Sequence, residues 1–138
     1  MNRYSLGELE VGLTESFKVS ISAEMLESFR EITGDINPLH CDEGFAKARG
    51  FSGRVAYGML VASLYSTLAG VYLPGERCLL HEVDAKFKKP VFIGDELTVS
   101  GSVSEINEAF SRLEISARIV NQKGETVNRA RIIAGVID

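Results

Sequence analysis

The sequence predicts an α+β domain in which an antiparallel sheet curls around one long helix. An apolar segment from Met59 to Leu73 is long enough for a buried helix, but it is shorter than the ~20 residues of a membrane span. After Cys78 the pattern changes to strand-like segments that are joined by turn sequences. A helix that is apolar over most of its surface is buried when such a sheet wraps around it.

Composition sets the broad class of protein. The 138 residues show no change of composition, so one domain over 1–138 is the simplest organisation. The sequence is 45% apolar and 25% charged, which is ordinary for a globular protein. A net charge of −4 without a basic run argues against a nucleic-acid partner. No secretory signal or membrane span is visible, so we expect a cytoplasmic protein.

The first half of the chain is predicted to be mainly helical. Ser22 is suited to cap the amino end of the first helix, and Gly34 is suited to end it. Pro74 and Gly75 stop the long apolar helix. The predicted elements are a strand over 17–21 and helices over 23–32, about 42–49 and about 59–72.

The second half is predicted to be a set of strands. Turn-forming residues such as Gly94-Asp95 and Gly124 lie in the short connections between them. Consecutive strands are therefore expected to be antiparallel neighbours in the sheet. The four predicted strands cover 79–91, 96–106, 111–121 and 126–136.

The turn between the first two helices carries the most informative residues. Asp35 and His40 lie on either side of Asn37-Pro38, in a loop at the carboxyl end of a helix. Proline fixes its own φ and restricts the residue before it, so the turn sets the directions of both side chains. The two residues are a candidate general acid/base pair. Taken singly, a turn-forming aspartate and an ordinary loop histidine are the alternatives.

Three segments together resemble the MaoC-like (R)-specific enoyl-CoA hydratases. Phe29–His40, followed after five residues by Ala46, is similar to the family signature, and Gly58–Ser66 and Lys86–Asp95 are similar to its central helix and next strand. The resemblance implies a hot-dog fold and a homodimer or higher homo-oligomer. It also implies reversible hydration of a trans-2-enoyl thioester of coenzyme A or a carrier protein to the (R)-3-hydroxyacyl thioester. Coenzyme A or phosphopantetheine is then part of the substrate, and no cofactor or metal is expected.

This chemistry requires a base at the α-carbon and an acid for the departing hydroxide. Asp35 and His40 could supply both, and the sequence does not divide the two roles between them. The Gly58 amide is expected to bind the thioester oxygen, because helix amino ends present unpaired N–H groups. A purely steric role for this glycine is the alternative. The resemblance gives Ser66 a hydrogen bond to the catalytic aspartate; the alternative is a bond to its own helix backbone.

We expect Asn37, Tyr57, Met59 and Leu60 to contribute to substrate binding. Tyr57 stands where most members of the family have histidine, so it could line the acyl pocket, contact the thioester or simply pack. His81 matches no motif and is assigned a structural role. Cationic side chains that could attract substrate phosphates, or could simply form a solvated face, are Lys86, Lys88, Lys89, Arg49 and Arg54.

Two other functions are open at this stage. A hot-dog acyl-CoA thioesterase would use one carboxylate and a helix amino end, without the Asp-x-Asn-Pro-x-His spacing. A non-catalytic acyl-thioester-binding subunit would tolerate the loss of either Asp35 or His40, yet both are present. Cys41 and Cys78 fit no zinc spacing and are expected to be free thiols.

Overall fold

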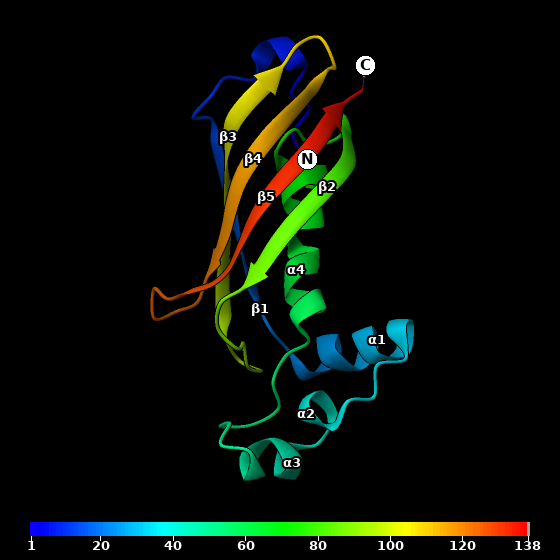
Figure 1. The fold of residues 1–138 in the computed structure, drawn as a ribbon, viewed down its shortest axis with the longest axis vertical. Helices are drawn as coiled ribbons and strands as arrows, with labels where there is room; N and C mark the ends of the chain where they lie inside the picture. The colour runs from blue at the N-terminus through cyan, green and yellow to red at the C-terminus, as the bar shows by residue number, and fades with distance from the viewer. Residues whose placement is uncertain (138) are drawn as a thin grey trace.

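The computed structural model describes residues 1–137 and shows one antiparallel sheet that curves around a central helix (Figure 1). This arrangement is that of the hot-dog fold, as the sequence predicted. In chain order the elements are η1 (Leu6–Glu8), β1 (Thr14–Ser20), α1 (Ala23–Thr33), α2 (Pro38–Cys41), α3 (Glu43–Ala48), α4 (Gly58–Thr67), the π-helical η2 (Leu68–Tyr72), β2 (Cys78–Phe87), β3 (Glu96–Asn107), β4 (Arg112–Val120) and β5 (Thr126–Val136).

The strands lie in the order β1-β3-β4-β5-β2, and every neighbouring pair is antiparallel. The expectation that consecutive strands are neighbours is right for β3, β4 and β5 but wrong for β2 and β3. The turn at Gly94 reverses the chain only locally. Its amide binds the Ile21 carbonyl at 2.8 Å, and the Val91 carbonyl accepts from the Ala56 amide at 2.7 Å. These contacts route the connection past the start of α4. The chain therefore leaves β2 at one edge of the sheet and enters β3 between β1 and β4, on the other side of the sheet.

The central helix packs on the concave face of the sheet through Val61, Ala62 and Tyr65. Close approach depends on Gly101 of β3. A Cβ atom there would lie 2.8 Å from Leu68 Cδ2 and 2.8 Å from Ile115 Cγ2, closer than carbon atoms can approach. The absence of a side chain at this position lets the end of the central helix rest directly on the sheet.

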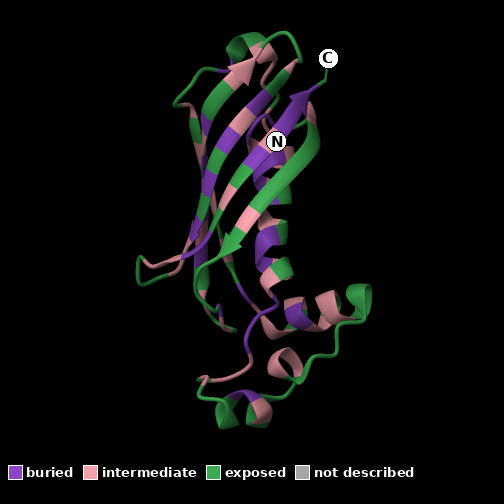
Figure 2. Cartoon of the chain, in the orientation of Figure 1, coloured by how far each residue is buried: buried purple, intermediate pink, exposed green. Residues whose placement is uncertain are grey.

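Strand β2 is an exposed edge of the sheet. In Figure 2 it is mostly green, whereas the adjacent β5 is largely buried. Its apolar side chains include Leu79, Leu80, Val83 and Phe87, which are 53%, 41%, 38% and 55% exposed. An apolar edge strand with unpaired backbone groups is suited to pair with another chain.

The helix ends in the first half agree with the local sequence. Ser22 Oγ accepts the Met25 amide at 3.2 Å and caps α1, and Gly34 ends α1 with a φ of +73° that favours glycine. His40, however, lies within the single-turn helix α2 and not in a loop as predicted. The Asn-Pro pair explains the difference, because proline is well tolerated at the first helical position and asparagine at the cap.

Candidate active site

The turn that carries Asp35 and His40 is fixed by its own side chains. Asp35 Oδ1 accepts the Asn37 amide at 3.0 Å, and Asn37 Oδ1 accepts the Leu39 amide at 3.0 Å as the cap of α2. Asp35 therefore has the turn-forming role that was considered as its alternative. Its second carboxylate oxygen remains available for another contact. The residue between them, Ile36, is 76% exposed.

His40 is oriented by the chain segment that precedes α4. Its Nδ1 lies 2.7 Å from the carbonyl oxygen of Val55. A carbonyl can only accept a hydrogen bond, so Nδ1 carries a proton. In the neutral ring Nε2 then has the free lone pair, which leaves this atom to take up or deliver a proton in a reaction.

Tyr57 holds the acid and the imidazole together. Its hydroxyl donates a 2.6 Å hydrogen bond to the backbone carbonyl of Asp35, and its ring lies 4.2 Å from that of His40 at an angle of 34°. The Cys41 sulfur is 3.4 Å from the same hydroxyl. Burial, followed by the contact with Cys41, raises the pKa of Tyr57 to about 12. The hydroxyl thus stays protonated and is engaged with the backbone under the candidate pair.

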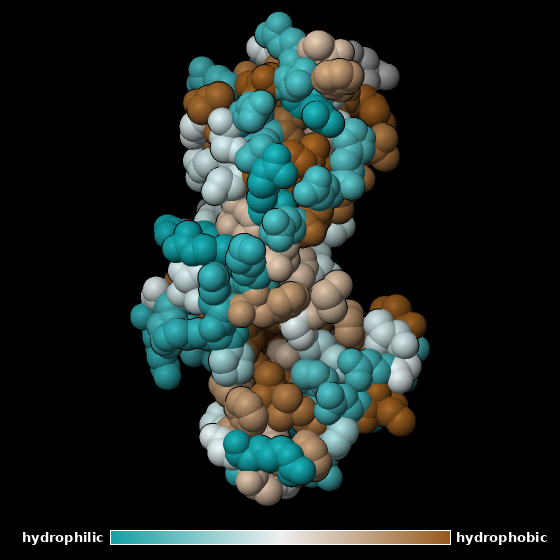
Figure 3. Space-filling view, in the orientation of Figure 1, coloured by the Kyte–Doolittle hydropathy of each residue, from teal (hydrophilic) through white to brown (hydrophobic). Residues whose placement is uncertain are grey.

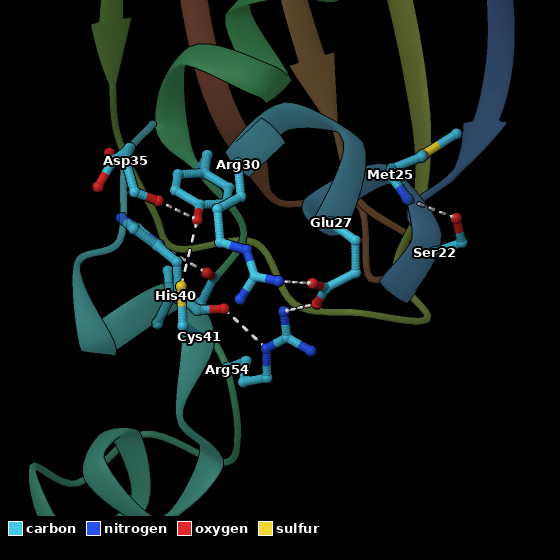
Figure 4. A network of polar contacts seen from close by, with 10 residues as sticks. Ser22, Met25, Glu27, Arg30, Asp35, His40, Cys41 and Arg54 are labelled. Atoms are coloured by element: carbon cyan, nitrogen blue, oxygen red, sulfur yellow. Dashed lines mark hydrogen bonds and ion pairs between the residues drawn. The ribbon is translucent and has the colours of Figure 1, made fainter. Parts of the chain in front are cut away.

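A chain of ion pairs supports the backbone of His40 from the other side (Figure 4). Arg54 donates from Nε to the His40 carbonyl at 2.7 Å and from Nη2 to Glu27 at 2.7 Å. Glu27 also pairs with Arg30 at 2.8 Å. The hydrogen bond from Arg54 lowers the pKa of Glu27. The sequence suggested phosphate binding or a solvated face for Arg54. It did not suggest this supporting role, because the partner Glu27 lies 27 positions away.

One cavity of about 980 Å³ brings together Asp35, His40, Gly58 and Ser66, the four predicted catalytic residues. Figure 3 shows apolar side chains around a hollow where the helical segments meet the sheet. In Figure 4 the side chains of Asp35 and His40 lie on the same side of their turn. The other residues that line the cavity are Phe29, Thr33, Tyr57, Met59, Ala62, Ser63, Leu80, Val83, Ala85 and Phe87.

Two of the predicted substrate-binding residues, Asn37 and Leu60, lie elsewhere. Asn37 is used as the cap of α2, and Leu60 lines a separate hollow with Met25 and Phe29. Met59 and Tyr57 do line the main cavity. Ser66 is exposed on α4, and within residues 1–137 no hydrogen bond joins it to Asp35. The predicted support of the aspartate by this serine therefore stays a prediction.

The geometry at Gly58 is compatible with both roles considered for it. No side chain caps the amino end of α4 in the described part of the chain, so its first N–H groups point to the end of the helix without a side-chain acceptor. A Cβ at Gly58 would lie 3.0 Å from Cδ1 and from Cε1 of Phe87. The residue is thus positioned as a donor at a helix end that carries partial positive charge, and its small size makes room for the ring.

Several residues of the cavity wall were not predicted from the sequence. Thr33 Oγ1 accepts a hydrogen bond from the Asp35 amide at 3.2 Å, so it fixes the start of the turn that carries Asp35 and His40. Its position two residues before the aspartate was an available indication. The β2 residues Leu80, Val83, Ala85 and Phe87 gave no indication of this kind, because only the curvature of the sheet brings them to α4.

The cationic side chains are divided among several roles. Arg49 lies over the ring of Phe45 at 3.3 Å, and Lys89 pairs with Glu125. Lys88 lines a second, smaller cavity next to the first. His81 sits at the bulge of β2, against Gly135, which agrees with a structural role. Both cysteines are free thiols, as expected.

The described residues contain neither a metal-binding cluster nor a membrane-spanning helix. No group of three or more His, Cys, Asp or Glu side chains within residues 1–137 could hold a metal ion. None of the helices there has the length and apolar character needed to cross a bilayer.

The fold and the site define a class of protein: a hot-dog domain with a candidate acid/base pair beside the amino end of its central helix. Such a site can move protons next to a carbonyl oxygen whose developing charge the helix end stabilises. A family comparison then identifies the chain. The MaoC-like domain matches residues 9–124, and the chain belongs to this family.

Individual relatives agree with this assignment. The chain is 42% identical over 99 residues to 3-hydroxybutyryl-CoA dehydratase from Methylorubrum extorquens. The aligned region covers 72% of this chain and 63% of that protein. The chain thus spans less than two thirds of this relative. The chain is also 36% identical over 120 residues to (R)-specific enoyl-CoA hydratase from Aeromonas caviae. That aligned region covers 87% of this chain and 90% of the hydratase.

Solved structures show the same likeness. The unliganded R-hydratase from Pseudomonas aeruginosa superposes with a TM-score of 0.92 at 31% identity, over 97% of this chain and 86% of that one. The (R)-hydratase from Aeromonas caviae superposes with a TM-score of 0.89 at 33% identity, over 93% and 97%. The resemblance found in the sequence is therefore confirmed.

Proposed function

We propose that this protein is a hydro-lyase that reversibly adds water to trans-2-enoyl thioesters and forms (R)-3-hydroxyacyl thioesters. The observation that carries the proposal is the joint placement of Asp35, His40 and the Gly58 helix end in one cavity. Relatives named (R)-specific enoyl-CoA hydratase and 3-hydroxybutyryl-CoA dehydratase support the same reaction and its stereochemistry.

In the hydration direction Asp35 and the His40 Nε2 atom would hold one water molecule at C3 of the enoyl group. As the water oxygen attacks C3, one of its protons passes to the pair, and a proton is delivered to C2. The hydroxyl group and the hydrogen added to the double bond together equal one water molecule. Negative charge that develops on the thioester oxygen would be stabilised by the Gly58 N–H. The reaction moves only water and protons, so it requires no redox cofactor.

We expect the substrate to be carried by coenzyme A or by the phosphopantetheine arm of a carrier protein. Relatives of both kinds are found, since two of them are named 3-hydroxyacyl-[acyl-carrier-protein] dehydratase. A homodimer or a higher homo-oligomer is part of the proposal. It is supported by the exposed apolar side chains of β2, an edge strand that pairing with a second copy would cover.

The decisive assay uses purified protein and crotonyl-CoA. Loss of the enoyl absorbance without release of free thiol, with chromatographic identification of (R)-3-hydroxybutyryl-CoA, is the expected result. Thiol release without hydration would show a thioesterase instead. Absence of turnover with short-chain, long-chain and carrier-protein-bound enoyl substrates would favour a binding subunit.

A further inference from the structure

A second cavity adjoins the candidate active site. Its volume is about 310 Å³, and three residues, His40, Gly58 and Phe87, line both cavities. The second cavity reaches inward to Asn128 of β5, which is 1% exposed, and outward to the exposed Lys88. A molecule that occupies the space around His40 and Gly58 can therefore extend into it.

Asn128 is the one buried polar residue in the core of the described chain, and its amide is only half satisfied. The Tyr65 hydroxyl donates to Asn128 Oδ1 at 2.9 Å. The Nδ2 atom is buried and has no hydrogen-bond partner among residues 1–137. Nearly all buried polar groups in proteins have a partner, so an unpaired amide in a cavity wall indicates a ligand atom or a water.

Tyr65 fixes which end of the amide is unpaired. Burial raises the pKa of Tyr65, so its hydroxyl keeps the proton that it donates to the amide oxygen. The two N–H bonds of Nδ2 are the unused groups. They suit a neutral oxygen acceptor, because a charged acceptor at such depth would require a buried cation beside it.

We infer that Asn128 is a substrate-binding residue. Its Nδ2 donates a hydrogen bond to a neutral oxygen on the part of the acyl-thioester substrate that enters the second cavity. This inference rests on the proposed function. The thioester carbonyl is a neutral oxygen too, but the proposed function assigns it to the Gly58 N–H. The remaining oxygens of this chemistry are the amide carbonyls of the pantetheine arm and those of an oxygenated acyl chain. The arm is favoured, since its far end bears phosphate and Lys88 lies at the exposed part of the cavity.

The test compares wild type with Asn128→Leu on a series of crotonyl thioesters. Crotonyl-CoA, crotonyl-pantetheine and crotonyl-N-acetylcysteamine retain amide carbonyls, whereas the S-butyl thioester has none. For substrates that include the acceptor we expect KM to rise about five- to tenfold, with kcat within about twofold. The variant should match wild type on the S-butyl thioester. A rise in KM confined to an S-butyl enoyl thioester with an ether oxygen in its acyl chain would place the acceptor on that chain.

Equal losses on every substrate would overturn the inference, because they would indicate a structural residue or one that holds only water. Unchanged kinetics on every substrate would also overturn it. If wild type hydrates no enoyl thioester, the proposed function itself fails. The two failures are thus distinguished by the wild-type rates.

A second pair of variants separates substrate binding from folding. Asn128→Leu leaves the Tyr65 hydroxyl without its acceptor, which can destabilise the core. The double variant Asn128→Leu/Tyr65→Phe removes both partners, so its thermal midpoint should return toward that of wild type. It still lacks the Nδ2 donor, so it should show the same rise in KM on the amide-bearing thioesters as Asn128→Leu. Tyr65→Phe alone retains the Nδ2 donor and should keep the wild-type ratio of KM values across the series.

Discussion

Asp35 and His40 line one cavity although each also has a local role in the turn. The carboxylate caps the Asn37 amide, and the imidazole is held by the Val55 carbonyl. These contacts use one atom of each side chain and leave the other for chemistry. For Asp35, a turn-forming role and the proposed catalytic role are thus compatible.

Removing either group should remove most of the activity. We expect Asp35→Asn and His40→Ala each to lower kcat by ~10²-fold or more, since general acid/base catalysis contributes factors of this size. Steady-state kinetics with crotonyl-CoA measure the effect, and circular dichroism with thermal unfolding checks that the fold is intact. Wild-type rates in either folded variant would refute the assignment.

Tyr57 provides a milder test of positioning. Tyr57→Phe keeps the ring against His40 but loses the hydrogen bond to the Asp35 carbonyl. We expect a loss of about 1 kcal/mol in the free energy of unfolding, measured with urea, and a smaller fall in kcat than for Asp35→Asn. A Tyr57→Phe variant as inactive as Asp35→Asn would instead give this hydroxyl a direct part in the reaction.

The raised pKa of Tyr57 also predicts a dependence of stability on pH. The unfolded tyrosine loses its proton near pH ~10, whereas the folded one does so near 12. The unfolded state therefore binds fewer protons between these values, and stability falls as pH rises through this window. Tyr57→Phe should show a shallower loss of stability from about pH 10 upward in urea titrations. Equal slopes for wild type and variant would contradict the prediction.

At the scale of elements, the site depends on how closely the start of α4 meets the end of β2. Gly58 belongs to the helix and Phe87 to the strand, and two ring atoms lie 3.0 Å from the position that a Cβ on Gly58 would take. Phe87 also lines both cavities. The close contact between the two elements thus favours glycine at this position, whereas the proposed donor role needs only its backbone N–H.

Gly58→Ala tests this packing because it retains the N–H group. We expect kcat/KM to fall by about tenfold or more as the ring is displaced into the cavity. Phe87→Ala serves as the matched control, and the double variant Gly58→Ala/Phe87→Ala should be close to Phe87→Ala alone. A double variant in which the two losses simply multiply would show that contact with Phe87 is not the reason for the glycine.

At the scale of the whole molecule, the exposed β2 edge is the feature that the single chain leaves incomplete. Its side chains Leu80, Val83 and Phe87 line the main cavity while they remain exposed. A second copy paired along β2 would cover this edge and close the cavity from outside. Oligomer and active site are therefore expected to depend on each other.

Leu79→Lys should weaken the proposed dimer. Leu79 is 53% exposed on β2 and does not line the main cavity, so the change places a charge on the edge without altering the site. We expect the dimer dissociation constant to rise about tenfold or more in analytical ultracentrifugation. Val11→Lys, at a 66% exposed position outside the sheet, is the control and should remain dimeric. A monomeric wild type would refute the prediction.

The sequence by itself determined those features that depend on neighbours along the chain. Ser22 and Gly34 bound α1, and Asn37 and Pro38 set the turn of Asp35 and His40, because capping and turn formation are local interactions. Only the tertiary structure decided that Arg54 supports His40, that β2 pairs with β5, and that the Nδ2 atom of Asn128 lies without a described partner beside the candidate site. Each of these depends on residues far apart in sequence, and their contacts follow from how the sheet curves around α4.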